Sequence, residues 1–295
     1  MSRAGGASGG RPMGMLGIMQ GRLLPPEAGR FQCFPRDGWA LEFPLAHEAG
    51  LGGIEWIYDA WGAEVNPIAD DAGIKQVRQL SRRHGVAVRS LCADWFMDFP
   101  LLRAADDELR RREDRLAWLL GRCRMLGITR IVLPFVDASR IDTPAETAAV
   151  AALLGRALPA ARETGVEIHL ETSLEPARFA ALLAAADDPM IRVNYDSGNS
   201  ASLGYDVREE FDAYGRRVGS VHIKDRTRGA GTVPLGTGGV DFPALMQCLR
   251  AVRYGGDFVL QAARGPVGDE TAWARRNRAF VEDLLARFPA GTGGA

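Results

Sequence analysis

Three side chains that can bind a metal ion stand at the ends of three successive apolar runs in the second half of the chain. Glu171 ends the run VEIHLE, Asp196 ends IRVNYD, and His222 lies in SVHIKD. Two carboxylates and one imidazole suit a borderline-hard divalent cation such as Mn²⁺, Mg²⁺ or Co²⁺ better than a soft one. The residue types therefore predict a divalent-metal site, provided that the fold brings the three strand ends together.

Each of these residues also has a purely structural explanation. Glu171 can cap the helix that follows it, since a carboxylate stabilises a helix N-terminus. Asp196 precedes Ser-Gly-Asn and can form an Asx turn. His222 lies between two apolar residues, where a lone histidine is more often a hydrogen-bonded core residue than a ligand. The metal interpretation depends on their order at successive strand ends, and His169, with the same strand parity as Glu171, is expected to pack or support the site one layer deeper.

The runs that carry these residues belong to a regular alternation of short apolar segments and longer amphipathic ones. Eight runs have the pattern of buried strands: MLGIMQ, GGIEWIY, VAVRSLC, ITRIVLPF, VEIHLE, IRVNYD, SVHIKD and DFVLQ. The stretches between them, such as 106–127 and 143–165, have helical patterns, and several end in a glycine that suits a left-handed C-cap.

Eight strand-helix units in about 270 residues predict an α/β fold, a (β/α)8 TIM barrel in a single domain. A doubly wound open sheet is the alternative, but it usually has fewer strands. Its first strand is also often followed by a glycine-rich phosphate loop, whereas QGRLLPP follows the first strand here.

Composition limits the setting in which the protein works. A net charge of -1 indicates no electrostatic surface for nucleic acid or an anionic membrane. Four widely spaced cysteines fit a reduced compartment, and no apolar run reaches the roughly 18 residues of a spanning helix. We expect a soluble, cytoplasmic catalytic barrel over residues 14–288, with flexible segments at 1–13, which lacks a signal-peptide core, and at 289–295.

Further polar and aromatic residues lie near the ends of the predicted strands, where TIM barrels have their active sites. The candidates for substrate binding are Gln20, Arg22, Glu55, Trp56, Asp94, Trp95, Asp137, Arg226 and Arg264. The basic ones, together with Lys224, can hold a phosphate or carboxylate group, although surface loops are commonly basic without a ligand. The aromatic ones can pack against the apolar face of a ligand or can equally belong to the core or rim.

Taken in order, these segments resemble the xylose-isomerase-like TIM barrels, in the sugar phosphate isomerase and epimerase branch that includes ketose 3-epimerases and hexulose-phosphate isomerases. The matching segments are GIMQGRL, GGIEW, HLET, NYDSGNSASLGYD, VHIKD and VPLGTGGVDFPAL, which together span roughly residues 15–285. The resemblance implies a metal held by Glu, Asp, His and Glu from the last four strands. Three of these ligands fall on Glu171, Asp196 and His222, and the fourth falls on Gln261.

Gln261 departs from the family pattern, in which two carboxylates remove and return a proton beside a carbonyl that the metal polarises. An amide does not titrate near neutral pH, although its carbonyl oxygen can bind a hard cation. One consequence is a one-base proton shift with Glu171 as the base. Another is a second acid supplied by Asp94, Asp137 or Lys224, and a third is a different reaction such as dehydration of a keto sugar.

The expected function is a divalent-metal-dependent isomerase or epimerase of a small sugar or sugar phosphate, with Glu171 and Lys224 as catalytic residues. The expected ion is Mn²⁺, with Mg²⁺, Co²⁺ or Zn²⁺ as alternatives, and barrels of this family often form homodimers. A metal-dependent lyase or dehydratase acting on a keto sugar, and a non-catalytic sugar-binding barrel, are the other hypotheses. The family's three-zinc DNA-repair endonucleases need many more histidines than the four present.

Overall fold

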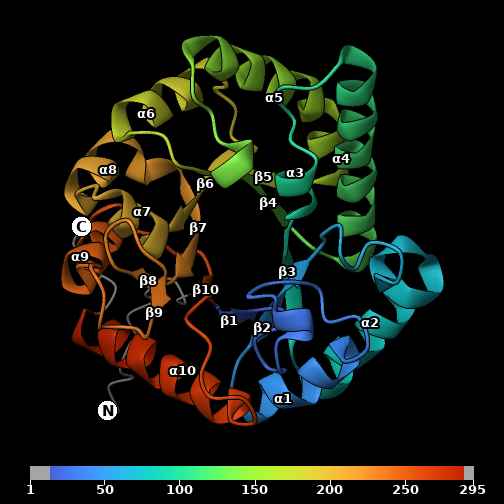
Figure 1. Ribbon diagram of the computed structural model, residues 1–295, viewed down its shortest axis with the longest axis vertical. Helices are drawn as coiled ribbons and strands as arrows, with labels where there is room; N and C mark the ends of the chain where they lie inside the picture. The colour runs from blue at the N-terminus through green and yellow to red at the C-terminus, as the bar shows by residue number, and fades with distance from the viewer. Residues whose placement is uncertain (1–13, 289–295) are drawn as a thin grey trace, which may run out of the picture.

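The protein is a closed barrel of eight parallel strands, described here by a computed structural model of residues 14–288 (Figure 1). The barrel strands are β1 (Leu16–Met19), β2 (Gly53–Ile57), β3 (Ala87–Cys92), β4 (Arg130–Phe135), β5 (Glu167–Thr172), β6 (Ile191–Asp196), β7 (Val218–Ile223) and β10 (Phe258–Leu260). Each follows its neighbour around the ring, and β1 pairs with both β2 and β10. The predicted single-domain TIM barrel is confirmed. The predicted flexible segments, 1–13 and 289–295, lie outside the described residues.

Helices follow the strands around this ring, most of them on its outer side, as Figure 1 shows. They are α1 (Glu42–Glu48), α2 (Asp71–His84), α3 (Trp95–Asp98), α4 (Asp106–Leu126), α5 (Pro144–Thr164), α6 (Pro176–Ala185), α7 (Ser197–Leu203), α8 (Val207–Tyr214), α9 (Phe242–Ala251) and α10 (Glu270–Arg287). Short 3-10 helices lie at Glu27–Gly29, Trp39–Leu41, Pro67–Ala69, Asp137–Ser139 and Gly215–Arg217. Within residues 14–288, none of the helices is long and apolar enough to cross a membrane.

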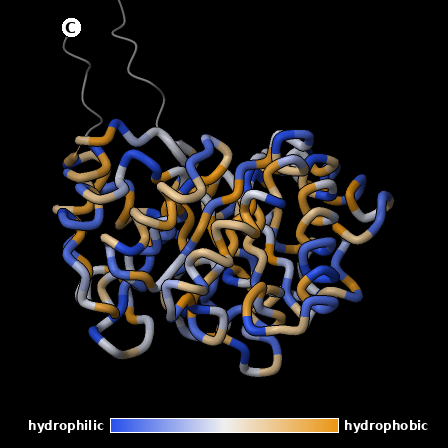
Figure 2. Tube along the Cα trace, turned by 90° about the horizontal axis from the view of Figure 1, so that it is seen from above, coloured by the Kyte–Doolittle hydropathy of each residue, from blue (hydrophilic) through white to orange (hydrophobic). Residues whose placement is uncertain are grey.

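Local sequence signals set these boundaries. The strands are buried along most of their length, as in β4, where every residue is buried, because helices cover one face and the barrel interior the other. The helices expected at 106–127 and 143–165 are α4 and α5, and Gly127 and Gly165 end them with φ of 89° and 70°. Thr143 and Glu146 form a capping box at the start of α5. Along the outer helices orange and blue segments alternate in Figure 2, as expected for helices with one apolar face.

A two-stranded sheet at the mouth of the barrel has no counterpart in the predicted pattern. β8 (Asp225–Arg226) pairs antiparallel with β9 (Thr232–Val233). The carboxylate of Asp225 accepts hydrogen bonds from the main-chain N–H groups of Gly236, Gly238 and Val240. A Cβ atom at position 238 would lie 2.3 Å from Asp225 Oδ1. The glycines of VPLGTGGV therefore let this loop wrap around Asp225, directly after the strand that carries His222.

Candidate active site

The three predicted metal ligands converge at the carboxyl ends of three neighbouring strands. Glu171 lies on β5, Asp196 ends β6 and His222 lies on β7, with Asp196 and His222 opposite each other in the strand register. One ligand atom from each of the three lies within 4.8 Å of the others, and all three residues are buried. Buried carboxylates this close together need a positive charge among them. The arrangement therefore forms a candidate metal centre.

His222 carries the clearest sign that a cation belongs in this cluster. Its Nε2 atom lies 2.8 Å from Oε1 of the buried Glu55, so Nε2–H donates to that carboxylate and Nδ1 is left as the ligand atom. Nδ1 is buried without a hydrogen-bond partner among the described residues, and it lies 3.3 Å from Glu171 Oε2. Burial lowers the pKa of His222, but the carboxylates of Glu55 and Glu171 outweigh burial and raise it to about 10. Nδ1 is thus a position where a proton or a metal ion is stabilised.

Asn194 and Asn199 orient the two carboxylates, Glu171 through their side chains and Asp196 through a main-chain N–H group. Asn194 Nδ2 donates to Glu171 Oε2 at 2.9 Å, and Asn199 Nδ2 donates to Glu171 Oε1 at 2.8 Å. Asp196 Oδ1 accepts from the main-chain N–H of Asn199 at 2.8 Å and so caps α7. The second oxygen, Oδ2, faces Lys224 Nζ at 3.2 Å. The capping explanation and the ligand explanation of Asp196 are therefore compatible, because each uses a different oxygen.

A chain of hydrogen bonds supports the centre from the layer below, where His169 was expected. His169 bonds Glu167 through Nε2 at 2.9 Å and Ser220 Oγ through Nδ1 at 2.7 Å. Ser220 Oγ donates to Asn194 Oδ1 at 2.6 Å, and Asn194 in turn donates to Glu171. Each polar group in this buried chain has a partner, which fixes the position of Glu171.

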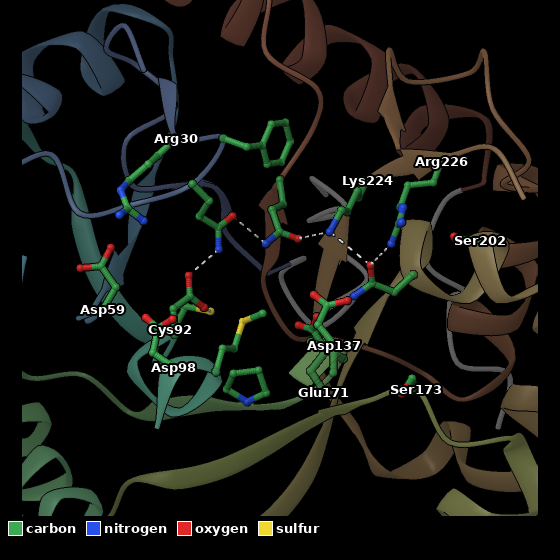
Figure 3. A pocket seen from close by; sticks show the side chains of 18 of the residues that line it. Arg30, Asp59, Cys92, Asp98, Asp137, Glu171, Ser173, Ser202, Lys224 and Arg226 are labelled. Atoms are coloured by element: carbon green, nitrogen blue, oxygen red, sulfur yellow. Dashed lines mark hydrogen bonds between the residues drawn. The ribbon is translucent and has the colours of Figure 1, made fainter. Parts of the chain in front are cut away.

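A cavity of about 430 Å³, lined in part by Glu171, opens at the mouth of the barrel (Figure 3). Of the predicted site residues, the cavity wall contains Asp94, Asp137, Glu171, Lys224, Arg226 and Gln261. In Figure 3, Lys224 and Arg226 lie on one side of the cavity, and Arg30 and Asp59 lie on the other. Asp137 begins a 3-10 helix after β4 with a left-handed φ of 50°. The cavity places a polar ligand within reach of Glu171.

The remaining predicted substrate-binding residues lie outside the wall of this cavity: Gln20, Arg22, Glu55, Trp56, Trp95 and Arg264. Trp56 is fully buried, and its indole N–H donates to Asn66 at 2.9 Å. Trp95 stacks on Phe99 with ring centroids 4.4 Å apart. The amide oxygen of Gln20 accepts from a main-chain N–H of β2. In the structure these side chains contact other residues of the protein. Their direct contact with a substrate stays a prediction.

Two of these residues, Arg22 and Arg264, fasten the segment that follows β1. Arg264 donates to the main-chain oxygens of Gly21, Leu24 and Phe31 at 2.8, 2.9 and 2.9 Å. Arg22 donates to the same Phe31 oxygen at 2.7 Å. The segment is thereby held at the mouth of the barrel.

Several cavity residues had not been singled out in the sequence. Gln32 comes from the segment after β1, where no periodic pattern marks its position, and it lines the cavity beside Asp94 and Gln261. Asn199 had a usable signal, since it lies one helical turn after Asp196, where its side chain can return toward the same strand end. Cys92 donates to Asp94 Oδ1 at 3.0 Å, and burial raises the pKa of Asp94.

Glu55→Gln is expected to weaken Mn²⁺ binding by about ten- to a hundredfold, because the carboxylate that orients a histidine ligand also makes it more basic. Calorimetric titration of the metal-free protein with Mn²⁺ measures the change. Glu48→Gln, at an exposed glutamate of α1, is the control and is expected to leave the Mn²⁺ affinity unchanged. Equal Mn²⁺ affinity of Glu55→Gln and the unaltered protein would show that Glu55 plays no part in metal binding.

Comparison with known proteins agrees with this architecture. Residues 43–284 match the family model described as Xylose isomerase-like TIM barrel. The inosose dehydratase of Geobacillus kaustophilus (strain HTA426) is 28% identical over 157 residues, which cover 45% of this chain and 51% of that protein. The chain thus spans about half the length of this curated relative.

Solved structures of sugar-acting and metal-containing proteins share the fold. The structure of L-ribulose 3-epimerase superposes with a TM-score of 0.74 at 19% identity, covering 93% of this chain and 95% of that one. The IOLI protein with a bound zinc atom has a TM-score of 0.74 at 14% identity, covering 94% of this chain and 100% of that one. At these identities the likeness establishes the barrel.

Proposed function

This chain belongs to the xylose isomerase-like TIM barrel family, and we propose that it is a divalent-metal-dependent isomerase or epimerase of a small sugar. The observation that carries the proposal is the buried cluster of Glu171, Asp196 and His222, in which Nδ1 of His222 lacks a partner among the described residues. Glu171 of this cluster lines a polar cavity at the mouth of the barrel, where barrel enzymes have their active sites. Mn²⁺ is the first candidate ion, since carboxylates and one imidazole suit it.

Glu171 is the proposed base. A divalent ion held by Glu171, Asp196 and His222, with the amide oxygen of Gln261 as a proposed fourth ligand, would polarise the substrate carbonyl and acidify the neighbouring C–H. Glu171 Oε2 lies on the side of His222 and Asn194, whereas Oε1 accepts from Asn199. Because hydrogen bonds hold both oxygens, the carboxylate is oriented before a substrate binds. Glu171 removes the proton beside the carbonyl and returns it to the carbonyl carbon in a one-base shift, while the hydroxyl proton of the neighbouring carbon passes to the former carbonyl oxygen, so that the carbonyl group moves by one carbon.

Lys224 is the proposed partner of the developing negative charge. Its side chain lines the cavity, and its ammonium group lies 3.2 Å from Asp196 Oδ2. A hydrogen bond from this ammonium to the carbonyl oxygen of the substrate would stabilise the charge that proton removal leaves there. For a two-base epimerisation, Asp94 is a candidate for the second acid-base group, since it lines the cavity and burial raises its pKa.

The charge of the cavity wall favours an uncharged sugar over a sugar phosphate. Beside Glu171, the wall contains four carboxylates, from Asp59, Asp94, Asp98 and Asp137, and three cations, from Arg30, Lys224 and Arg226. Arg226 donates to Ala230 O and Asn199 Oδ1, and the guanidinium of Arg30 lies over the ring of Trp61. A phosphate would meet like charges and cations that already have partners, whereas sugar hydroxyls can donate to the carboxylates.

A second candidate reaction is dehydration of a keto sugar. It is supported by Gln261, which cannot act as the second carboxylate base, and by the 28% identity to an inosose dehydratase. In this reaction Glu171 removes a proton beside the carbonyl, and an acid such as Lys224 protonates the departing hydroxyl group, so that water is released.

Proton exchange tests the proposal. We expect that the protein with Mn²⁺ in D₂O introduces deuterium at the carbon beside the carbonyl of at least one free ketose, measured by NMR. The mass of the product distinguishes the reactions, because isomerisation leaves the mass of the undeuterated sugar unchanged and dehydration removes one water. Sugar binding with no exchange and no Mn²⁺ uptake would instead support a non-catalytic barrel. Formation of a homodimer stays a prediction, and size-exclusion chromatography tests it.

A further inference from the structure

Gln32 has only one amide orientation that suits its neighbours. Its Oε1 atom lies 3.1 Å from the guanidinium of Arg22, and its Nε2 atom lies 2.7 Å from the carboxylate of Asp94. A guanidinium only donates hydrogen bonds, and a carboxylate only accepts them. The oxygen of Gln32 must therefore face Arg22 and its NH₂ group must face Asp94, because the reverse orientation would place donor against donor and acceptor against acceptor.

The orientation of Gln32 determines the orientation of Gln261. The two amides meet at Gln32 Oε1, which accepts from Gln261 Nε2 at 2.9 Å. Since this side of Gln261 must donate, its oxygen faces the opposite way, where it accepts from Lys224 Nζ at 3.3 Å. In Figure 3, dashed lines mark hydrogen bonds made by Lys224. Gln32 thus directs the only acceptor of the Gln261 amide toward the ammonium group beside Asp196.

The ammonium of Lys224 is held among oxygens that would also suit a metal ion. Nζ donates to Asp196 Oδ2 at 3.2 Å, to Gln261 Oε1 at 3.3 Å and to Asn199 Oδ1 at 3.2 Å. Asp196 Oδ2 is the oxygen that capping leaves free, because Oδ1 caps α7. The lysine side chain is only 11% exposed. A hard divalent cation prefers the same carboxylate and amide oxygens.

The chain around Lys224 is built to keep the side chain in this position. Ser197 Oγ bonds the main-chain N–H and carbonyl oxygen of Lys224 at 3.1 and 2.7 Å. Gly198 faces the aliphatic part of the side chain, and a Cβ atom there would lie 2.6 Å from Lys224 Cγ. The absence of a side chain at position 198 therefore makes room for the lysine.

We propose that Lys224 is an internal cation that competes with the divalent ion for Asp196 Oδ2 and Gln261 Oε1, and that Gln32 positions Gln261 for this exchange. Without the metal, the ammonium balances the charge of Asp196. When the ion binds, it displaces the ammonium from these two oxygens toward the cavity, where Lys224 can reach a substrate. The inference rests on the proposed function in that it assumes a divalent ion at Glu171, Asp196 and His222.

Metal affinity measures this competition without any turnover. In calorimetric titrations of metal-free protein with Mn²⁺, Lys224→Met is expected to bind roughly ten- to a hundredfold more tightly than the unaltered protein, because a positive charge near the ion has been removed. Lys224→Arg keeps the charge and is the matched control, expected within a few-fold of the unaltered protein. Gln32→Leu is expected to bind Mn²⁺ several-fold more weakly, because Gln261 is then free to rotate its oxygen away.

A melting measurement provides an independent readout. Metal-free Lys224→Met is expected to melt at a lower temperature than the unaltered protein, because Asp196 loses its nearby cation, and Mn²⁺ is expected to restore the loss. If Lys224→Met does not fold, Lys224→Gln replaces it in both measurements. Mn²⁺ affinity that stays the same or falls when the charge of Lys224 is removed would overturn this proposal alone. Failure of the unaltered protein to bind Mn²⁺ would overturn the proposed metal-dependent function as well.

Discussion

Glu171→Gln is expected to lower the rate of deuterium exchange beside the substrate carbonyl by about a hundred- to ten-thousandfold, because the variant has no group to accept the proton. Glutamine nearly preserves the shape of the side chain, so the fold and the cavity are expected to persist. The amide oxygen can still bind a cation, but the amide nitrogen would face one of the two asparagine NH₂ groups that now donate to Glu171. The measurement is the NMR exchange rate in D₂O with Mn²⁺ at saturation.

A lower exchange rate of Glu171→Gln has to be separated from weaker metal binding, because Glu171 is both the proposed base and a proposed metal ligand. A titration with Mn²⁺ gives the affinity of Glu171→Gln, so the exchange rate can be compared at equal occupancy. Glu175→Gln, at an exposed glutamate just after the same strand, is the control and is expected to leave exchange unchanged. If Glu171→Gln exchanges protons within tenfold of the unaltered protein at full occupancy, another group is the base. The structure would then direct attention to Asp94 and Lys224.

The barrel and the convergence of the three candidate ligands could be predicted because both depend on regular elements. A buried strand has one register that keeps its apolar residues covered, so the residue at its carboxyl end is fixed in space once the barrel is recognised. Glu171, Asp196 and His222 converge for this reason. Their support by Asn194 and His169 follows from the same alternation, since side chains two residues apart along a strand share a face.

The cavity wall could not be predicted in the same way, because irregular segments supply much of it. Gln32 lies between β1 and α1. The position of this segment depends on Arg264, which donates to the main-chain oxygen of Phe31 and is 233 residues away from it in the sequence. Arg264 itself was expected to hold an anionic group of a substrate. In the structure its guanidinium donates to three main-chain oxygens. A basic residue at a strand end can hold a loop in place or bind a ligand. Sequence periodicity does not distinguish the two roles.

Glu42→Gln is expected to stabilise the protein at pH 8 by about 2 to 4 kcal/mol while changing little at pH 5. Glu42 is fully buried at the start of α1, and its Oε1 accepts from the main-chain N–H groups of Gly21 and Leu23. Burial is the largest influence and raises the pKa of this carboxyl from 4.5 to about 8, although these hydrogen bonds oppose it. Its Oε2 atom has no hydrogen-bond partner among the described residues, which a neutral carboxyl group tolerates better than a charged one.

The direction of the pH effect follows from proton binding. Between about pH 4.5 and pH 8 the folded protein keeps the proton of Glu42 while the unfolded chain loses it, so stability falls as the pH rises through this range. Glutamine removes this dependence, since it is neutral at every pH in the range. Urea unfolding at intervals from pH 5 to pH 8 gives the difference between the two proteins, and Glu48→Gln, on the exposed side of the same helix, should follow the unaltered protein. Parallel curves for Glu42→Gln and the unaltered protein would mean that Glu42 is charged in the fold. Its carboxylate would then hold the Gly21–Leu23 turn, and with it the segment that carries Gln32, through charge-assisted hydrogen bonds.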